Sequence, residues 1–134
     1  MPVAVSRPIS VTLPEGPYPH IRLVGELRYD TALPYGVGLA FPPRGPGEED
    51  IVWWFGRDLL AEGRRAPSGE GDVRIAPGTD GRILITLGNG TDRAVLSVPA
   101  DTVTRFLADA FAEVPPGAES AHLDLDFGLA RLLA

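Results

Sequence analysis

Apolar and polar residues alternate along the first half of the chain in a pattern that is typical of β-strands. Residues 21–29 place apolar or small residues at odd positions and mostly polar ones at even positions, as in a strand with one buried and one solvated face. Residues 2–13 alternate more loosely, and Pro8 favours an edge strand there because proline cannot donate a backbone hydrogen bond. Residues 35–41 predict a third strand, whose two glycines would let a neighbouring group approach closely.

An unbroken apolar run, IVWWF at residues 51–55, predicts a fourth strand. A strand with one solvated face would alternate, so we expect this strand to be covered on both faces. Neighbouring side chains of a strand point to opposite faces. We therefore expect one of Trp53 and Trp54 in the core and the other under a helix or against another subunit.

The second half of the chain predicts helices around a second group of strands. A short helix would span residues 57–63, with Asp58 in its first turn and Gly63 as a stop. An amphipathic pattern from residue 99 to residue 114 predicts a longer helix. Leucines within residues 125–133 indicate a final one. Strands separated by glycine-rich turn signals are expected over residues 73–76, 82–87 and 93–98.

This order of elements predicts an α+β fold with antiparallel sheets: four strands, a connecting helix, three strands and packing helices. The chain has 134 residues. A chain of that size can bury roughly 68% of its unfolded surface, enough for one core without disulfides or metals. We expect a single domain over residues 1–134.

The amino-acid composition indicates where the protein acts and which partners it can bind. The chain has no cysteine and no apolar run as long as a membrane helix, so we expect a cytoplasmic protein without a membrane segment. Its net charge is −6, from 18 acidic and 12 basic residues, which argues against a nucleic-acid partner because phosphate binding needs surplus positive charge. Four arginines within residues 57–74 would form a basic patch if they converged, but pairing with Glu62, Glu70 and Asp72 is the more common arrangement.

Candidate catalytic groups are few, since the chain has no cysteine or lysine and only two histidines, His20 and His122. We interpret both histidines as surface residues. A metal site at His122, Asp124 and Asp126 is disfavoured, because acidic residues at a helix start already have a role as caps. A weaker hypothesis is an enzyme that uses Asp58, Glu62 and His122, which would have to meet in one pocket. We therefore expect no catalytic residues, no cofactor and no metal.

Several separate motifs occur in a fixed order along the chain. They are LRYD at 27–30, PY at 34–35, Trp53 with Phe55, RDLLAEG at 57–63, GEGDVR at 69–74, VPPG at 114–117 and LDLD at 123–126. Together these motifs resemble the SsgA-like proteins, the actinobacterial family that controls sporulation-specific cell division. The resemblance covers about residues 20–134 and departs from the family at Trp54, where members rarely carry so bulky a residue.

This resemblance implies more than periodicity can show. It implies two sheets wrapped into a barrel-like body similar to the whirly proteins, with about seven or eight strands, and association as a homotrimer. It further implies a non-enzymatic adaptor that is recruited to the division septum. Such an adaptor would influence septum placement and peptidoglycan maintenance through FtsZ and other septation proteins, including other SsgA-like proteins.

The polar segment after the Trp-containing strand is our candidate partner surface, with Arg57, Glu62, Arg64 and Arg65 as its residues. Trp53 and Trp54 are assigned to the core or to a subunit interface. An alternative hypothesis is a single-stranded nucleic-acid-binding module of whirly-like fold, in which these aromatic rings would stack on bases.

Overall fold

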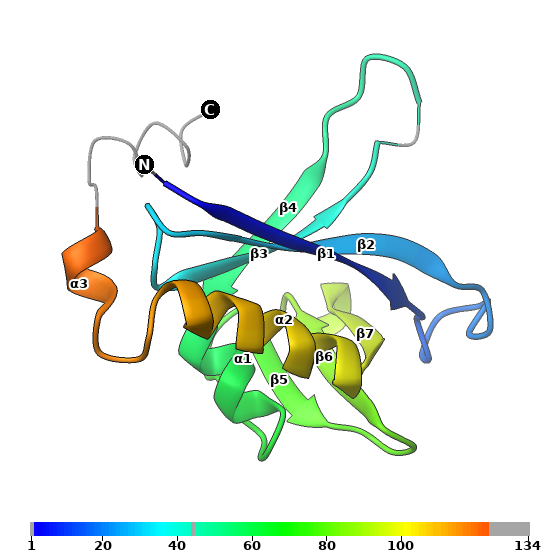
Figure 1. The fold of residues 1–134 in the computed structure, drawn as a ribbon. Helices are drawn as coiled ribbons and strands as arrows, with labels where there is room; N and C mark the ends of the chain where they lie inside the picture. Colours follow the sequence, from blue (N-terminus) through cyan, green and yellow to red (C-terminus); the bar gives the residue numbers. More distant parts are fainter. Residues whose placement is uncertain (1, 44, 124–134) are drawn as a thin grey trace.

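Two antiparallel sheets form the body of the protein (Figure 1). The computed structural model describes residues 2–43 and 45–123. Within them, the first sheet has four strands in the order β1-β2-β3-β4 and the second has three in the order β5-β6-β7. The predicted α+β class and strand count are confirmed. The strands are β1 (Ala4–Val11), β2 (Leu23–Asp30), β3 (Gly36–Phe41), β4 (Ile51–Gly56), β5 (Val73–Pro77), β6 (Arg82–Leu87) and β7 (Ala94–Pro99).

Helices connect and cover the sheets. The helix α1 (Arg57–Gly63) follows β4 directly, and α2 (Ala100–Glu113) follows β7, so both predicted helices are confirmed. A 3₁₀ helix η1 (Gly90–Asp92) lies between β6 and β7, and a short α3 (Glu119–His122) comes last. The helix predicted within residues 125–133 lies outside the described residues.

The two sheets do not close into a barrel, which corrects the barrel-like body implied by the resemblance. They meet on one side, where Thr12, just after β1, forms an isolated antiparallel bridge with Ser97 of β7. On the other side, α1 contacts both β4 and β5. A helix between the two free edges prevents their backbones from pairing, because strands must lie about 4.8 Å apart to hydrogen-bond.

The core lies between the sheets and is covered by α2. Side chains at alternate positions of the strands, such as Leu27, Leu39 and Ile85, are fully buried. The apolar stripe of α2 is also buried, including Phe106 and Leu107, and α2 contacts β1 and β7. Burial of side chains of this size stabilises the fold by about 1.5–3 kcal/mol each.

The strand β4 is an edge strand, and the prediction that both of its faces are covered is wrong within the described chain. Ile51 is 63% exposed and Trp54 is 36% exposed, whereas Phe55 is buried. The outward-facing residues of this apolar run are explained by their contact with the neighbouring strand. Val52 and Trp54 lie over Gly38 of β3, because a Cβ added to Gly38 would stand 3.1 Å from atoms of both side chains. The expected close approach at a β3 glycine is thus confirmed, and it comes from the neighbouring strand.

Candidate partner-binding surfaces

Arg57 lies in the core, so the prediction that it belongs to an exposed partner surface is wrong. Its side chain is 1% exposed. Nη1 donates hydrogen bonds to Tyr29 Oη at 3.0 Å and to the carbonyl oxygens of Ala110 and Val114 at 3.2 and 2.8 Å. Nη2 forms an ion pair with Glu119 Oε1 at 2.9 Å. The guanidinium therefore joins β2, the end of α2 and the start of α3.

Aromatic rings complete the surroundings of this guanidinium. Its Cζ lies 4.2 Å from the centroid of the Phe111 ring and 5.0 Å from that of Tyr29, within the range of a cation–π contact. The last turn of α2 contains no basic residue. Arg57 thus supplies, from another element, the positive charge that the carbonyl end of a helix favours.

Two titrating groups contact Arg57, and the sequence indicated neither of them. The backbone N–H of Glu119 itself, the Arg57 guanidinium and the N–H of Gly117 hold the pKa of the Glu119 carboxyl below its ordinary value, against the opposing effect of burial. Burial raises the pKa of Tyr29 to about 12, and the Tyr29 hydroxyl donates to the Pro34 carbonyl oxygen at 2.9 Å. These pKa shifts reflect a structural network, because every partner is a group of the fold.

The other three candidate residues remain at the surface around the end of α1. Glu62 and Arg65 are exposed. Arg64 is partly buried, because its Nε donates to the Ala61 carbonyl oxygen at 3.2 Å and its Nη1 lies 3.5 Å from Thr104 Oγ1 of α2. Arg64 therefore contacts α2, and Glu62 and Arg65 are exposed residues of the same short segment.

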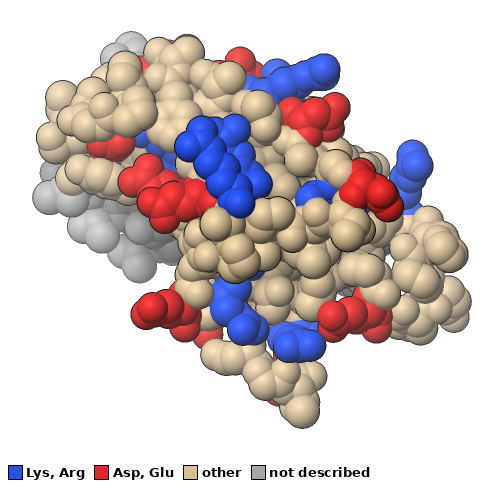
Figure 2. Space-filling view, turned by 90° about the horizontal axis from the view of Figure 1, so that it is seen from below, with Lys and Arg blue, Asp and Glu red and all other residues tan. Residues whose placement is uncertain are grey.

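The four arginines of residues 57–74 neither converge nor pair with the acids considered above. Arg57 points inward, and within the described residues no ion pair joins Arg64, Arg65 or Arg74 to an acid. Asp72 instead accepts a hydrogen bond from Asn89 at 2.8 Å. On the face shown in Figure 2, basic and acidic side chains are interspersed. Such a surface suits protein contacts better than a phosphate backbone.

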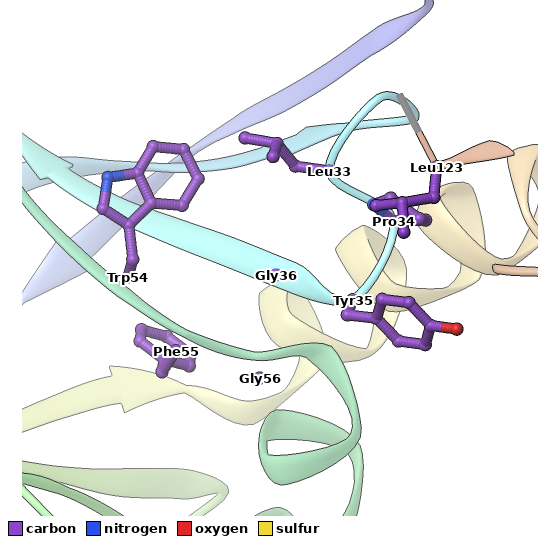
Figure 3. Close-up of a pocket in the computed structure, with 8 residues that line it drawn as sticks. All are labelled: Leu33, Pro34, Tyr35, Gly36, Trp54, Phe55, Gly56 and Leu123. Atoms are coloured by element: carbon purple, nitrogen blue, oxygen red, sulfur yellow. The ribbon is translucent and has the colours of Figure 1, made fainter. Parts of the chain in front are cut away.

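Trp53 and Trp54 point to opposite faces of β4. Trp53 packs against the core cluster. Trp54 lies on the outer face of the sheet and lines a shallow groove of about 320 Å³ (Figure 3). In Figure 3, Trp54 and Phe55 lie on opposite sides of the strand, and Tyr35 points its hydroxyl away from the groove. The groove is lined by Leu33, Pro34, Tyr35, Gly36, Trp54, Phe55, Gly56 and Leu123.

All residues that line the Trp54 groove are uncharged. A surface that binds single strands combines stacking rings with a positively charged groove that follows the phosphates. The surroundings of Trp54 offer a ring without those charges. The groove therefore fits an apolar protein surface, and the nucleic-acid hypothesis gains no support from it.

The groups considered for catalysis or metal binding are not assembled within residues 2–43 and 45–123. No three His, Asp or Glu side chains of that part of the chain come close enough together to hold a metal ion, so Asp58, Glu62 and His122 do not form such a group. His20 and His122 are exposed. Asp124 and Asp126 lie outside the described residues. No helix in the described part of the chain is long and apolar enough to span a membrane.

Together, the fold and these surfaces define a two-sheet α+β domain with exposed polar and apolar faces. Residues 23–119 match the protein family described as "Streptomyces sporulation and cell division protein, SsgA". The chain belongs to the SsgA family.

Curated relatives carry the same assignment. The chain is 45% identical over 111 residues to the sporulation-specific cell division protein SsgB of Streptomyces coelicolor, covering 81% of this chain and 80% of that protein. It is 41% identical over 121 residues to SsgB of Kineococcus radiotolerans, covering 87% and 72%. These relatives are cell division proteins of actinobacteria, and the family is not known for enzymes.

Solved structures agree with the fold. One, from work on SsgB mutations that correlate with longitudinal cell division during sporulation of Streptomyces coelicolor, superposes with a TM-score of 0.80 at 38% identity, covering 92% of this chain and 98% of that one. The SsgA-like sporulation-specific cell division protein from Thermobifida fusca gives a TM-score of 0.79 at 30% identity, covering 96% and 95%. The described elements are thus those of the family.

Proposed function

We propose that this protein is a non-enzymatic adaptor in sporulation-specific cell division, which acts at the division septum through contacts with other proteins. The partners proposed are FtsZ and other septation proteins, including SsgA-like ones, with consequences for septum placement and peptidoglycan maintenance. The observation that carries the proposal is the similarity to SsgB of Streptomyces coelicolor over 81% of the chain.

The surface around Glu62, Arg64 and Arg65 supports a role in partner contact. Among the described residues, none of these three side chains forms an ion pair. Arg64 is oriented by its bonds to Ala61 and Thr104. An arginine with free donors on a fixed surface suits recognition of carboxylates on a partner.

Charge reversal tests this surface. We expect Arg65→Glu to weaken capture of FtsZ or another septation protein from the native host, because a charge that attracted the partner would now repel it. The double variant Arg64→Glu/Arg65→Glu should weaken it further, by about tenfold or more. The measurement is co-purification from the host, with septal localisation of a fluorescent fusion as a second readout.

Arg22→Glu is the matched control, since Arg22 is also exposed but lies in the loop before β2. It should leave partner capture unchanged. Equal capture by the wild-type protein and the double variant would exclude this surface. Normal septation after deletion of the gene, together with no captured division protein, would reject the adaptor function itself.

We further propose that the protein works as a homotrimer and that Trp54 contributes to a subunit interface. A partly exposed indole beside an uncharged groove is a side chain that a second subunit would cover. The edge position of β4 also leaves one side of that strand without a β-strand partner in the described chain.

A further inference from the structure

The loop that joins β1 to β2 carries exposed apolar side chains at one end of the molecule, the end opposite α3 in Figure 1. Tyr18 is 71% exposed and Ile21 is 55% exposed. At the start of β2, Leu23 and Val24 are 41% and 63% exposed. Four of the nine large apolar residues that are exposed in the described chain thus lie within seven positions. Such a concentration marks an interaction surface, whereas single exposed apolar residues do not.

Two turns and three prolines give this loop a defined shape. The backbone N–H of Gly16 donates to the carbonyl oxygen of Leu13 at 3.0 Å, and that of Ile21 donates to Tyr18 at 3.2 Å. The second turn brings Tyr18 and Ile21 together, because the ends of such a turn lie within about 7 Å of each other. Prolines at positions 14, 17 and 19 restrict the backbone further. We call residues 17–22 the loop tip, and little conformational entropy is lost when it binds.

The loop tip is free of acidic residues, although the chain is acidic overall. Residues 16–25 contain one arginine, Arg22, and no aspartate or glutamate. Glu15, just before them, is paired with Arg93 at 3.5 Å. The net charge of the chain is −6, but at physiological salt exposed charges more than about 8 Å apart are largely screened. The loop tip can therefore approach an anionic surface.

The acidic residues nearest to this patch lie on the side of β2. Glu48 and Glu49 line a groove together with Leu23 and Val24. Tyr18, Ile21 and Arg22 line neither that groove nor the Trp54 groove. The contact surface is accordingly centred on these three residues, away from the acids and from the subunit interface proposed at Trp54.

We propose that the loop tip inserts into the surface of a lipid bilayer that contains anionic headgroups. Tyr18 and Ile21 enter the boundary between headgroups and acyl chains, where tyrosine is enriched in membrane-bound proteins. Arg22 stays at the level of the lipid phosphates, with its apolar stem along the boundary. A bilayer accepts a projecting apolar tip of any shape, whereas a protein partner would need a pocket that matches it. The inference goes beyond the proposed protein contacts and does not depend on them.

Co-sedimentation of the purified chain with lipid vesicles tests the inference without any division protein. One set of vesicles contains phosphatidylcholine and phosphatidylglycerol, and the other contains phosphatidylcholine alone. We expect saturable binding to the mixed vesicles. Binding to the uncharged vesicles should be about threefold to fivefold weaker, because the attraction between Arg22 and anionic lipids is lost.

Variants of the loop tip locate the contact. Tyr18→Ser/Ile21→Ser should weaken binding to both kinds of vesicle by about tenfold or more, because it removes the apolar contact. Arg22→Gln should weaken binding to the mixed vesicles alone. The matched controls are Val3→Ser, at an apolar residue that is 42% exposed, and Arg65→Gln, at an exposed arginine. Both should bind like the wild-type chain, and far-UV circular dichroism checks that each variant is folded.

Fluorescence quenching separates insertion from adsorption at the headgroups. Tyr18→Trp adds an indole at the loop tip. Lipids with brominated acyl chains should quench the fluorescence of this variant more strongly than that of the wild-type chain, whose tryptophans are Trp53 and Trp54. Equal quenching of the two proteins would reject insertion.

Three further results would overturn the inference. They are no sedimentation of the wild-type chain with either kind of vesicle, equal binding by the wild-type chain and a folded Tyr18→Ser/Ile21→Ser variant, and equal losses in Ile21→Ser and Val3→Ser. Loss of a captured host protein by the double variant, without any vesicle binding by the wild-type chain, would assign the loop tip to a protein partner instead. Because the vesicles contain no protein, the sedimentation results are independent of whether FtsZ is captured from the host.

Discussion

At the scale of single residues, Arg57 holds together parts of the chain that are distant in sequence. Its guanidinium contacts Tyr29, Ala110, Val114 and Glu119. A buried charge of this kind is tolerated because an acid, three oxygen acceptors and two aromatic rings replace its water. Removing the arginine would leave Glu119 without its counter-charge and the α2 carbonyl oxygens without this donor.

We therefore expect Arg57→Met to lower the free energy of unfolding by about 3–5 kcal/mol, the usual cost of breaking a buried pair from one side. Urea unfolding followed by circular dichroism measures it. Arg65→Met, at an exposed arginine of the same segment, is the control and should change stability by no more than about 0.5 kcal/mol. The double variant Arg57→Met/Glu119→Gln should regain part of the lost stability, because it no longer leaves the Glu119 carboxylate without a counter-charge. A cost below about 1 kcal/mol for Arg57→Met would contradict the structural role of the network.

At the scale of elements, the position of α1 depends on a close contact with β5. Gly63 is the last residue of α1, and a Cβ added there would overlap the side chain of Ile75 in β5. Glycine stands at this position because the helix and the strand approach too closely for any side chain, since Gly63 has no positive φ. The glycine that the sequence indicated as a helix stop is thus also a packing residue.

Gly63→Ala is accordingly expected to destabilise the protein by about 1–3 kcal/mol, as overpacking of a core contact does, although alanine is the better helix former. The matched control is Gly71→Ala, because Gly71 has a non-positive φ and open space around its would-be Cβ. Thermal unfolding of both variants measures the difference. A Gly63→Ala variant as stable as Gly71→Ala would show that α1 can move away from β5 without cost.

At the scale of the whole molecule, two sheets joined on one side and separated by α1 on the other leave apolar surface at two places. One is the Trp54 groove, and the other is a groove whose lining includes Leu23, Phe41, Ile51 and Trp53. The two grooves share no lining residue, so the subunit interface proposed at Trp54 would leave the other groove open.

Light scattering tests the homotrimer and the subunit interface proposed at Trp54. We expect the wild-type protein to have about three times the chain mass of 14.3 kDa, and Trp54→Ser to shift the mass toward that of a single chain by removing an aromatic anchor. Tyr18→Ser is the control, at a residue that is 71% exposed and outside both grooves. A wild-type mass of 14.3 kDa would contradict the trimer. An unchanged mass for a folded Trp54→Ser variant would place the interface elsewhere.

The sequence predicted the features that depend on neighbouring residues. Strand alternation, the amphipathic stripe of α2 and the turn at Asp80-Gly81, where φ is positive at both residues, are local, because each follows from the geometry of one element. The role of the β4 run could not be predicted this way. Its outer side chains cover a glycine on β3, and only the register between the two strands brings Trp54 to Gly38.

The burial of Arg57 could not be predicted from neighbouring residues either. By sequence it belongs to a polar segment with Arg64 and Arg65, yet the helix that starts with it turns its side chain beneath α2. The sequence by itself determined the seven strands, the helices α1 and α2 and, through its motifs, the family, because these depend on residues close together in the chain. The tertiary structure decided which charges are buried and which apolar surfaces stay open, because burial depends on contacts between residues far apart in the chain, such as Arg57 and Glu119.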